Sequence, residues 1–117
     1  MPIHLKRIYE QPSEEDGTRI LVERLWPRGI SKEKAAIDFW SKDTAPSHAL
    51  RKWFNHDPAR WEEFKTRYFA ELDENPGAVA ELLSYAKEDK TTFVYASREE
   101  KMNNAVALKA YLEHHAK

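Results

Sequence analysis

The chain has 117 residues, 33% of them charged, and a formal net charge of −1, which is typical of one globular domain spanning residues 1–117. It contains no cysteine, which excludes disulfides, thiol nucleophiles and cysteine-ligated metals and favours a cytoplasmic location. The near-zero charge disfavours nucleic acid as a partner, and the absence of any apolar run near the roughly 20 residues of a membrane span predicts no membrane association.

Two strands are predicted in the first part of the chain. Ile3 to Tyr9 begins with alternating apolar residues, and residues 18–25 contain the apolar run Ile20-Leu21-Val22. The Asp16-Gly17 dipeptide between them is a strong turn signal. Two arrangements remain open, because these strands can pair as a hairpin or lie in one sheet without touching. Residues 35–41 fit a short third strand and a helical turn equally well.

Helix signals dominate residues 47–86. Ser47 is a good N-cap for a short helix. Asp57-Pro58 and Asn75-Pro76 each combine a capping residue with a proline at the first helical position, which predicts two further helices. The first of these has the clearest periodicity, with apolar side chains at three- and four-residue steps: Trp61, Phe64, Tyr68 and Leu72.

The chain ends with one more strand and one more helix. Thr91 to Ala96 is uncharged and rich in β-branched and aromatic residues, which is typical of an interior strand. The order of elements predicts an α/β fold, a single small domain with a three- to four-stranded sheet and about four helices. Ligands of such sheets bind where strands end and loops begin. We expect the exits at residues 26–31 and 97–104 to converge at one edge.

Arg24, Trp26 and Arg28 follow the second predicted strand. Guanidinium groups present fixed forks for carboxylate or phosphate, and an indole can stack on a base or a cation. We therefore expect Arg24 and Arg28 to bind an anion, with Trp26 as a wall of the site. The structural alternative is that Trp26 belongs to the core and Arg24 pairs with a nearby carboxylate.

Two further groups of polar residues are candidates. Asn103 and Asn104 follow the last predicted strand, and two successive asparagines are more than a helix cap requires, so we expect them to orient the polar part of a ligand. His56 and Asp57 lie between two predicted helices, where the histidine could transfer protons while the carboxylate orients it. Helix capping alone, however, explains Asp57.

The leading hypothesis is a protein that binds an anionic small molecule, such as a nucleotide or phosphorylated metabolite, with or without catalysis. Neither a dinucleotide-binding fingerprint nor a P-loop is present, and the five histidines lack metal-ligand spacing, so we predict no cofactor and no metal site. One alternative is a nucleic-acid-binding or regulatory module. Another is a protein-interaction domain with an exposed apolar patch formed by Trp53, Phe54 and Trp61.

Several stretches match a known pattern: residues 16–22, 23–34, 45–47, 50–58, 60–61 and 103–106. The run Arg-Leu-Trp-Pro-Arg-Gly at residues 24–29 is highly specific, and on these stretches the chain resembles the YeaO-like proteins of domain-of-unknown-function family 488. The resemblance implies a small bacterial or archaeal cytosolic protein and brings no agreed chemistry. The family usually has an aspartate where this chain has Glu23, so the negative charge is kept.

Overall fold

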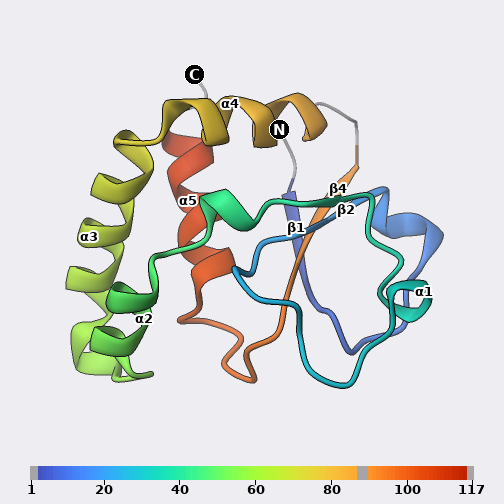
Figure 1. Cartoon of the computed structure of the whole chain (residues 1–117), viewed down its shortest axis with the longest axis horizontal. Coiled ribbons are helices and arrows are strands. Elements are labelled where there is room, and N and C mark those ends of the chain that lie inside the picture. The colour runs from blue at the N-terminus through green and yellow to red at the C-terminus, as the bar shows by residue number, and fades with distance from the viewer. Residues whose placement is uncertain (1–2, 87–89, 116–117) are drawn as a thin grey trace.

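Four parallel strands form one sheet in the computed structural model, which describes residues 3–86 and 90–115 (Figure 1). The strands are β1 (Ile3–Arg7), β2 (Thr18–Leu21), β3 (Phe39–Trp40) and β4 (Thr91–Tyr95), and their order in the sheet is β1-β4-β2-β3. The first two strands therefore lie in one sheet without touching, since β4 separates them. This arrangement is the second of the two that the sequence left open.

The central position of β4 follows from its composition. All five of its residues are buried, and it pairs with β1 on one side and β2 on the other. Ile20 is level with Phe93 and Leu21 with Val94 in the β2–β4 register. Because successive side chains of a strand point to opposite faces, each of these pairs belongs to a different layer of the molecule.

Helices cover one face of the sheet. They are α2 (His48–Phe54), α3 (Trp61–Asp73), α4 (Pro76–Tyr85) and α5 (Asn104–His115), as the sequence predicted. The short α1 (Lys32–Ala35) is a fifth helix, and it precedes β3, so residues 32–40 hold both a helical turn and a strand. The predicted α/β class is confirmed. Among the described residues, no helix is long and apolar enough to cross a membrane.

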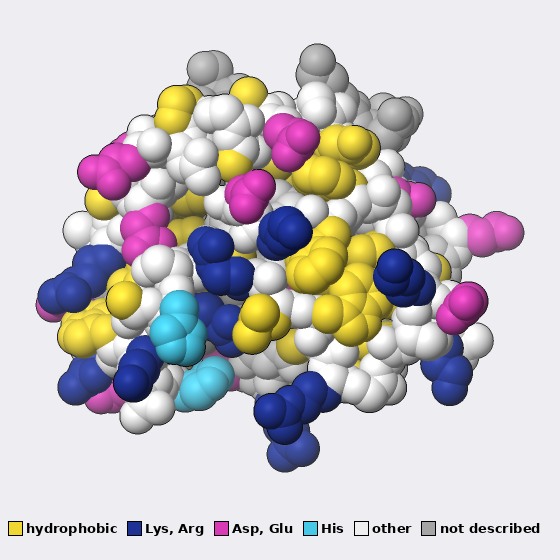
Figure 2. All heavy atoms as spheres, viewed as in Figure 1, with side chains coloured by type: hydrophobic (Ala, Val, Ile, Leu, Met, Phe, Trp, Pro, Cys, Tyr) yellow, Lys and Arg dark blue, Asp and Glu magenta, His cyan; other side chains and the backbone are white. Residues whose placement is uncertain are grey.

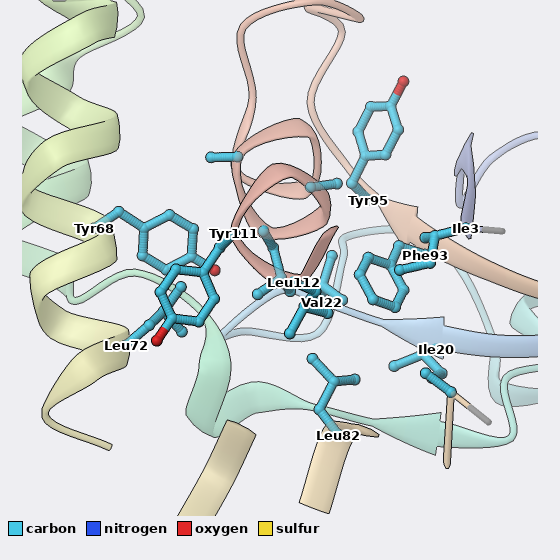
Figure 3. Packing of buried hydrophobic residues seen from close by; sticks show 14 of the residues in the cluster. Ile3, Ile20, Val22, Tyr68, Leu72, Leu82, Phe93, Tyr95, Tyr111 and Leu112 are labelled. Carbon is cyan, nitrogen blue, oxygen red and sulfur yellow. The ribbon is translucent and has the colours of Figure 1, made fainter. Parts of the chain in front are cut away.

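The larger core lies between the sheet and these helices (Figure 3). The helices α3, α4 and α5 contribute Tyr68, Leu72, Leu82, Tyr111 and Leu112 to this core. From the sheet side, Ile20 of β2, Val22 just after it and Phe93 of β4 complete the core. The Tyr68 hydroxyl donates to the backbone carbonyl of Thr44 at 2.5 Å, which satisfies the polar group of a fully buried ring.

A smaller cluster covers the other face of the sheet. It contains Leu21 and Val94, and Trp26 and Trp40 pack on it edge to face with ring centroids 5.5 Å apart. The chain after β2 thus crosses to this face before it returns as β3. Trp26 belongs to the packing of the protein, as the structural alternative for this residue anticipated.

A buried ion pair fixes the amino-terminal end of β2. The Arg19 guanidinium donates to the Asp16 carboxylate at 2.6 Å and to the carbonyl oxygens of Ala35 and Ala36 at the end of α1. The Lys6 ammonium lies 3.2 Å from the same carboxylate. Asp16 also accepts from the Ser13 backbone N–H at 3.0 Å, so every charge in the cluster has a partner.

Candidate functional site

A cavity of about 610 Å³ lies at the carboxyl ends of β2 and β4. Its lining comes from the two strand exits, from α2 and the turn after it, and from the start of α5. Ligand sites of open α/β sheets occur at this end of the strands. The volume falls within the range of roughly 300–1,000 Å³ that is usual for small-molecule pockets.

The two exits meet because β2 and β4 are neighbours. The ladder continues one bond past β2, where the Val22 N–H donates to the Val94 carbonyl at 3.1 Å. The Ala96 N–H then donates to Oε2 of Glu23 at 3.1 Å, and Nδ2 of Asn104 donates to the Val22 carbonyl at 2.7 Å. The predicted convergence therefore involves residues 22–25 and 96–104, whereas residues 26–31 turn to the opposite face of the sheet.

Glu23, Ser97, Asn103 and Asn104 form the polar floor of the cavity. Glu23 is only 6% exposed. Burial, the largest influence, raises the pKa of this carboxyl above its ordinary value of 4.5. The Ala96 N–H, the positive charge of Arg51 and the Asn104 amide offset only part of that effect. A buried carboxylate with incomplete compensation is a common feature of functional sites.

The cationic wall of the cavity consists of His48, Arg51, Lys52 and His56. The first three occupy positions i, i+3 and i+4 of α2 and therefore share one face of the helix. Figure 2 shows histidine side chains next to lysine or arginine side chains over the region of α2. Within the described part of the chain, no carboxylate lies within 4.0 Å of the charged group of Arg51 or Lys52. Both cations remain available to an anionic ligand.

Contacts at its N-terminus hold α2 beside the strand exits. The Ser47 hydroxyl caps the helix by accepting from the Leu50 N–H at 3.1 Å, and it donates to Glu71 of α3 at 2.6 Å. The Arg24 guanidinium donates to the carbonyl oxygens of Ala45 and Pro46 at 2.8 and 3.2 Å. Arg24 is thus a positioning residue for the cationic wall.

The predicted anion-binding group of Arg24, Trp26 and Arg28 does not line the cavity. The guanidinium of Arg24 is used by backbone carbonyls, and the Trp26 indole donates to the Ile30 carbonyl at 2.8 Å. Arg28 is exposed, and its backbone carbonyl accepts from the Tyr9 hydroxyl at 2.9 Å. The group lies outside the cavity because the chain after β2 turns to the other face of the sheet and because Arg24 finds long-range partners that spacing along the chain does not reveal. A role of these residues in binding an anion stays a prediction.

The two asparagines do line the cavity, in different ways. Asn103 caps α5, since its Oδ1 accepts from the Val106 N–H at 2.9 Å and its Nδ2 donates to the Glu99 carbonyl at 2.7 Å. Asn104 ties α5 to the exit of β2 through Val22. A ligand role for either residue stays a prediction, although both lie at the cavity.

His56 and Asp57 are separated by the structure. His56 lines the cavity and Asp57 does not. The Asp57 carboxylate accepts from the Ala59 N–H at 2.9 Å and pairs with Arg60 at 3.6 Å, so it caps the 3₁₀ turn η3 (Pro58–Arg60). No hydrogen bond links Asp57 to His56 among the residues that the structure describes. Their catalytic roles stay a prediction, and the geometry supplies no oriented pair.

The expected apolar patch of Trp53, Phe54 and Trp61 is only partly exposed. Phe54 is buried in the larger core, and Trp53 lies under the guanidinium groups of Arg60 and Arg67, at 5.2 and 4.2 Å from its ring centroid. The Lys65 ammonium lies over the Trp61 ring in the same way, 5.4 Å from the ring centroid. The aromatic rings of α2 and α3 pack on one another and on cations, and Trp53 and Trp61 remain half-buried, so a role of this region in binding a partner stays a prediction.

Sequence reasoning missed four titratable lining residues, Glu23, His48, Arg51 and Lys52, as well as the apolar part of the lining. The i, i+3, i+4 spacing of His48, Arg51 and Lys52 on a short predicted helix was the available signal. As for metals, no cluster of histidine and acidic side chains within residues 3–86 and 90–114 could hold an ion.

Comparisons with known proteins give one consistent result. The family model DUF488-N3i, described as the inactive DUF488-N3 subclade, matches residues 2–117. An uncharacterised protein of Mycobacterium tuberculosis is 40% identical over 106 residues, covering 91% of this chain and 89% of its own length. YeaO of Escherichia coli, also uncharacterised, is 38% identical over 112 residues, which cover 96% of this chain and 97% of YeaO. No solved structure matches significantly.

Proposed function

Because the chain belongs to the DUF488 family, in the subclade described as inactive, we propose that it binds a small phosphorylated ligand and does not transform it. The observation that carries the proposal is that one cavity is lined both by the cationic wall, whose Arg51 and Lys52 form no ion pair with a described residue, and by the polar floor with the buried Glu23 and Asn103. The ligand class is that of a nucleotide or phosphorylated metabolite.

The chemistry of the wall suits a phosphate group. Arg51 presents a planar fork of donors, and Lys52 adds a compact positive charge one residue further along α2. His48 and His56 add ring nitrogens at the same wall, and an imidazole N–H can donate to a phosphate oxygen. An anion here replaces no existing ion pair, so binding does not require any described contact to break.

The rest of the cavity suits a ligand with an apolar part. Leu25, Pro46, Phe54, Phe64 and Met102 line it together with the polar groups. Leu25 is 69% exposed, which is unusual for a leucine beside a cavity and leaves its side chain free to cover a bound molecule. An apolar lining with a few convergent polar groups is the usual composition of small-molecule sites.

Nucleic acid fits this surface less well. The cations are confined to one seven-residue helix and the turn after it, and the whole chain carries a net charge of −1. A protein that tracks a nucleic-acid backbone needs a longer basic groove, usually with aromatic rings on which bases stack. The site therefore matches one phosphorylated molecule better than a polymer.

Calorimetric titration of the full chain tests the proposal with three probes: AMP, adenosine and a single-stranded oligonucleotide. We expect AMP to bind at least ten times more tightly than adenosine, because the phosphate contributes charge-assisted hydrogen bonds. We also expect AMP affinity to fall only modestly between 50 and 200 mM salt. Equal affinities for AMP and adenosine would contradict the proposal. So would tighter binding of the oligonucleotide with a steep salt dependence.

A further inference from the structure

Among the residues that the structure describes, two acidic residues are buried, one at each end of the sheet, and their environments differ. Asp16 has two cations and a backbone N–H as direct partners. Oε2 of Glu23 accepts from the Ala96 N–H, the Asn104 amide adds a second hydrogen bond, and Arg51 acts on the carboxylate only at longer range, since no described cation lies within 4.0 Å of it. As whole residues, Asp16 is 8% exposed and Glu23 is 6% exposed. Only Glu23 lines the 610 Å³ cavity.

Glu23 therefore keeps unused acceptor capacity at a cavity. An ionised carboxylate offers about four acceptor sites, and the Ala96 N–H and the Asn104 amide use no more than two of them. The Asn104 amide lies close enough to stabilise the charge, but its own short hydrogen bond goes to the Val22 carbonyl. The raised pKa of Glu23 agrees with this incomplete set of partners. A bound molecule with hydrogen-bond donors would complete it.

We infer that Glu23 is a specificity-determining residue that accepts hydrogen bonds from hydroxyl groups of the ligand, so the preferred ligand class is a hydroxylated phosphate ester such as a sugar phosphate. This inference rests on the proposed function, since it assumes that the cationic wall of α2 holds the phosphate. The ligand would then span the cavity, with its phosphate at Arg51 and Lys52 and its hydroxyl groups at Glu23.

Hydroxyl groups fit better than the other common donor, an ammonium group. The cavity already contains Arg51 and Lys52, with two histidines beside them, and a further positive charge on the ligand would be repelled by that wall. A hydroxyl donates to the carboxylate without adding charge. Sites built to hydrogen-bond a substrate hydroxyl reject analogues that lack it strongly, because their buried polar groups are left unpaired.

Calorimetry with ribose 5-phosphate, inorganic phosphate and phosphoethanolamine tests the inference on the full chain. We expect ribose 5-phosphate to bind at least ten times more tightly than either other probe. We define the advantage of ribose 5-phosphate as the ratio of its affinity to that of inorganic phosphate. In Glu23→Gln this advantage is expected to shrink at least fivefold, while the affinity for inorganic phosphate stays the same or rises. Glu23→Asp keeps the charge but shortens the side chain by one methylene group, which moves the carboxylate away from the ligand hydroxyl groups. It should therefore also reduce the advantage of ribose 5-phosphate.

Thermal melting serves as the folding control. Glu23→Gln is expected to melt no lower than the wild type, because the change removes a buried charge and leaves an amide oxygen to accept from Ala96. If inorganic phosphate binds but ribose 5-phosphate has no advantage, the inference fails and the proposed function stands. An advantage that survives in both Glu23 variants, or preferred binding of phosphoethanolamine, also overturns the inference. If no phosphorylated probe binds, the proposed function fails with it.

Discussion

Replacing Asp16 by alanine is expected to lower the free energy of unfolding by about 3–5 kcal/mol at pH 7. The change leaves the guanidinium of Arg19, which is only 4% exposed, without its counter-charge. It also removes the acceptor for the Ser13 N–H in the capping box of the 3₁₀ turn η1 (Glu14–Asp16). Urea denaturation measures the loss. Glu15→Ala is the matched control, because Glu15 is exposed and should change stability by less than about 0.5 kcal/mol.

The same carboxylate gives a pH dependence with a defined sign. Burial acts to raise the pKa of Asp16, but hydrogen bonds from Ser13, Lys6 and Arg19 outweigh it and hold the net pKa below the ordinary value of 3.8. A lowered pKa in the folded state stabilises the protein fully above 3.8, and that contribution is lost as the pH falls through the folded-state value. Acidification should therefore lower the free energy of unfolding less in Asp16→Asn than in the wild type. An identical loss in both proteins would contradict this account.

Arg51→Ala is expected to weaken AMP binding by about 10- to 150-fold, since a hydrogen bond to a charged group contributes roughly 1.5–3 kcal/mol. Its side chain is exposed and forms no ion pair within the described residues, and its only described charge partner is Glu23 at longer range, so the melting temperature should fall only slightly. The change in calorimetric affinity then reports the lost ligand contact and not a loss of folded protein.

Arg28→Ala is the matched control for Arg51→Ala. Arg28 is also an exposed arginine, but it does not line the cavity, and we expect its replacement to leave AMP affinity within twofold of the wild type. A large effect of Arg28→Ala combined with a small effect of Arg51→Ala would move the anion site to residues 26–31, where the sequence first placed it.

The elements of this fold could be predicted because their signals are local. The caps Ser47 and Asp57, the apolar spacing of α3 and the uncharged run of β4 each depend on residues within one or two turns of one another. Residues 35–41 were ambiguous because the strand there has only two residues and pairs with a distant partner, β2.

The site was only partly predictable because its geometry depends on long-range pairing. Asn104 was expected after the last strand and His56 between two helices, and the structure places both at the cavity. Arg24 looked like an anion ligand because nothing local showed that its partners are the carbonyls of Ala45 and Pro46. The importance of Glu23 emerges only once β4 lies beside β2 and brings the Ala96 N–H to its carboxylate.

The location of the ligand is tested most directly by following the backbone amide resonances of the ¹⁵N-labelled protein as AMP is added. We predict the largest shifts at the carboxyl end of the sheet, at Glu23, Ala96 and Asn104, and on α2 at Arg51. The second cavity, about 330 Å³ at the opposite end near Lys6 and Asp16, should stay unchanged. Shifts confined to residues 26–31 or to that opposite end, or no shifts at millimolar AMP, would contradict the central claim.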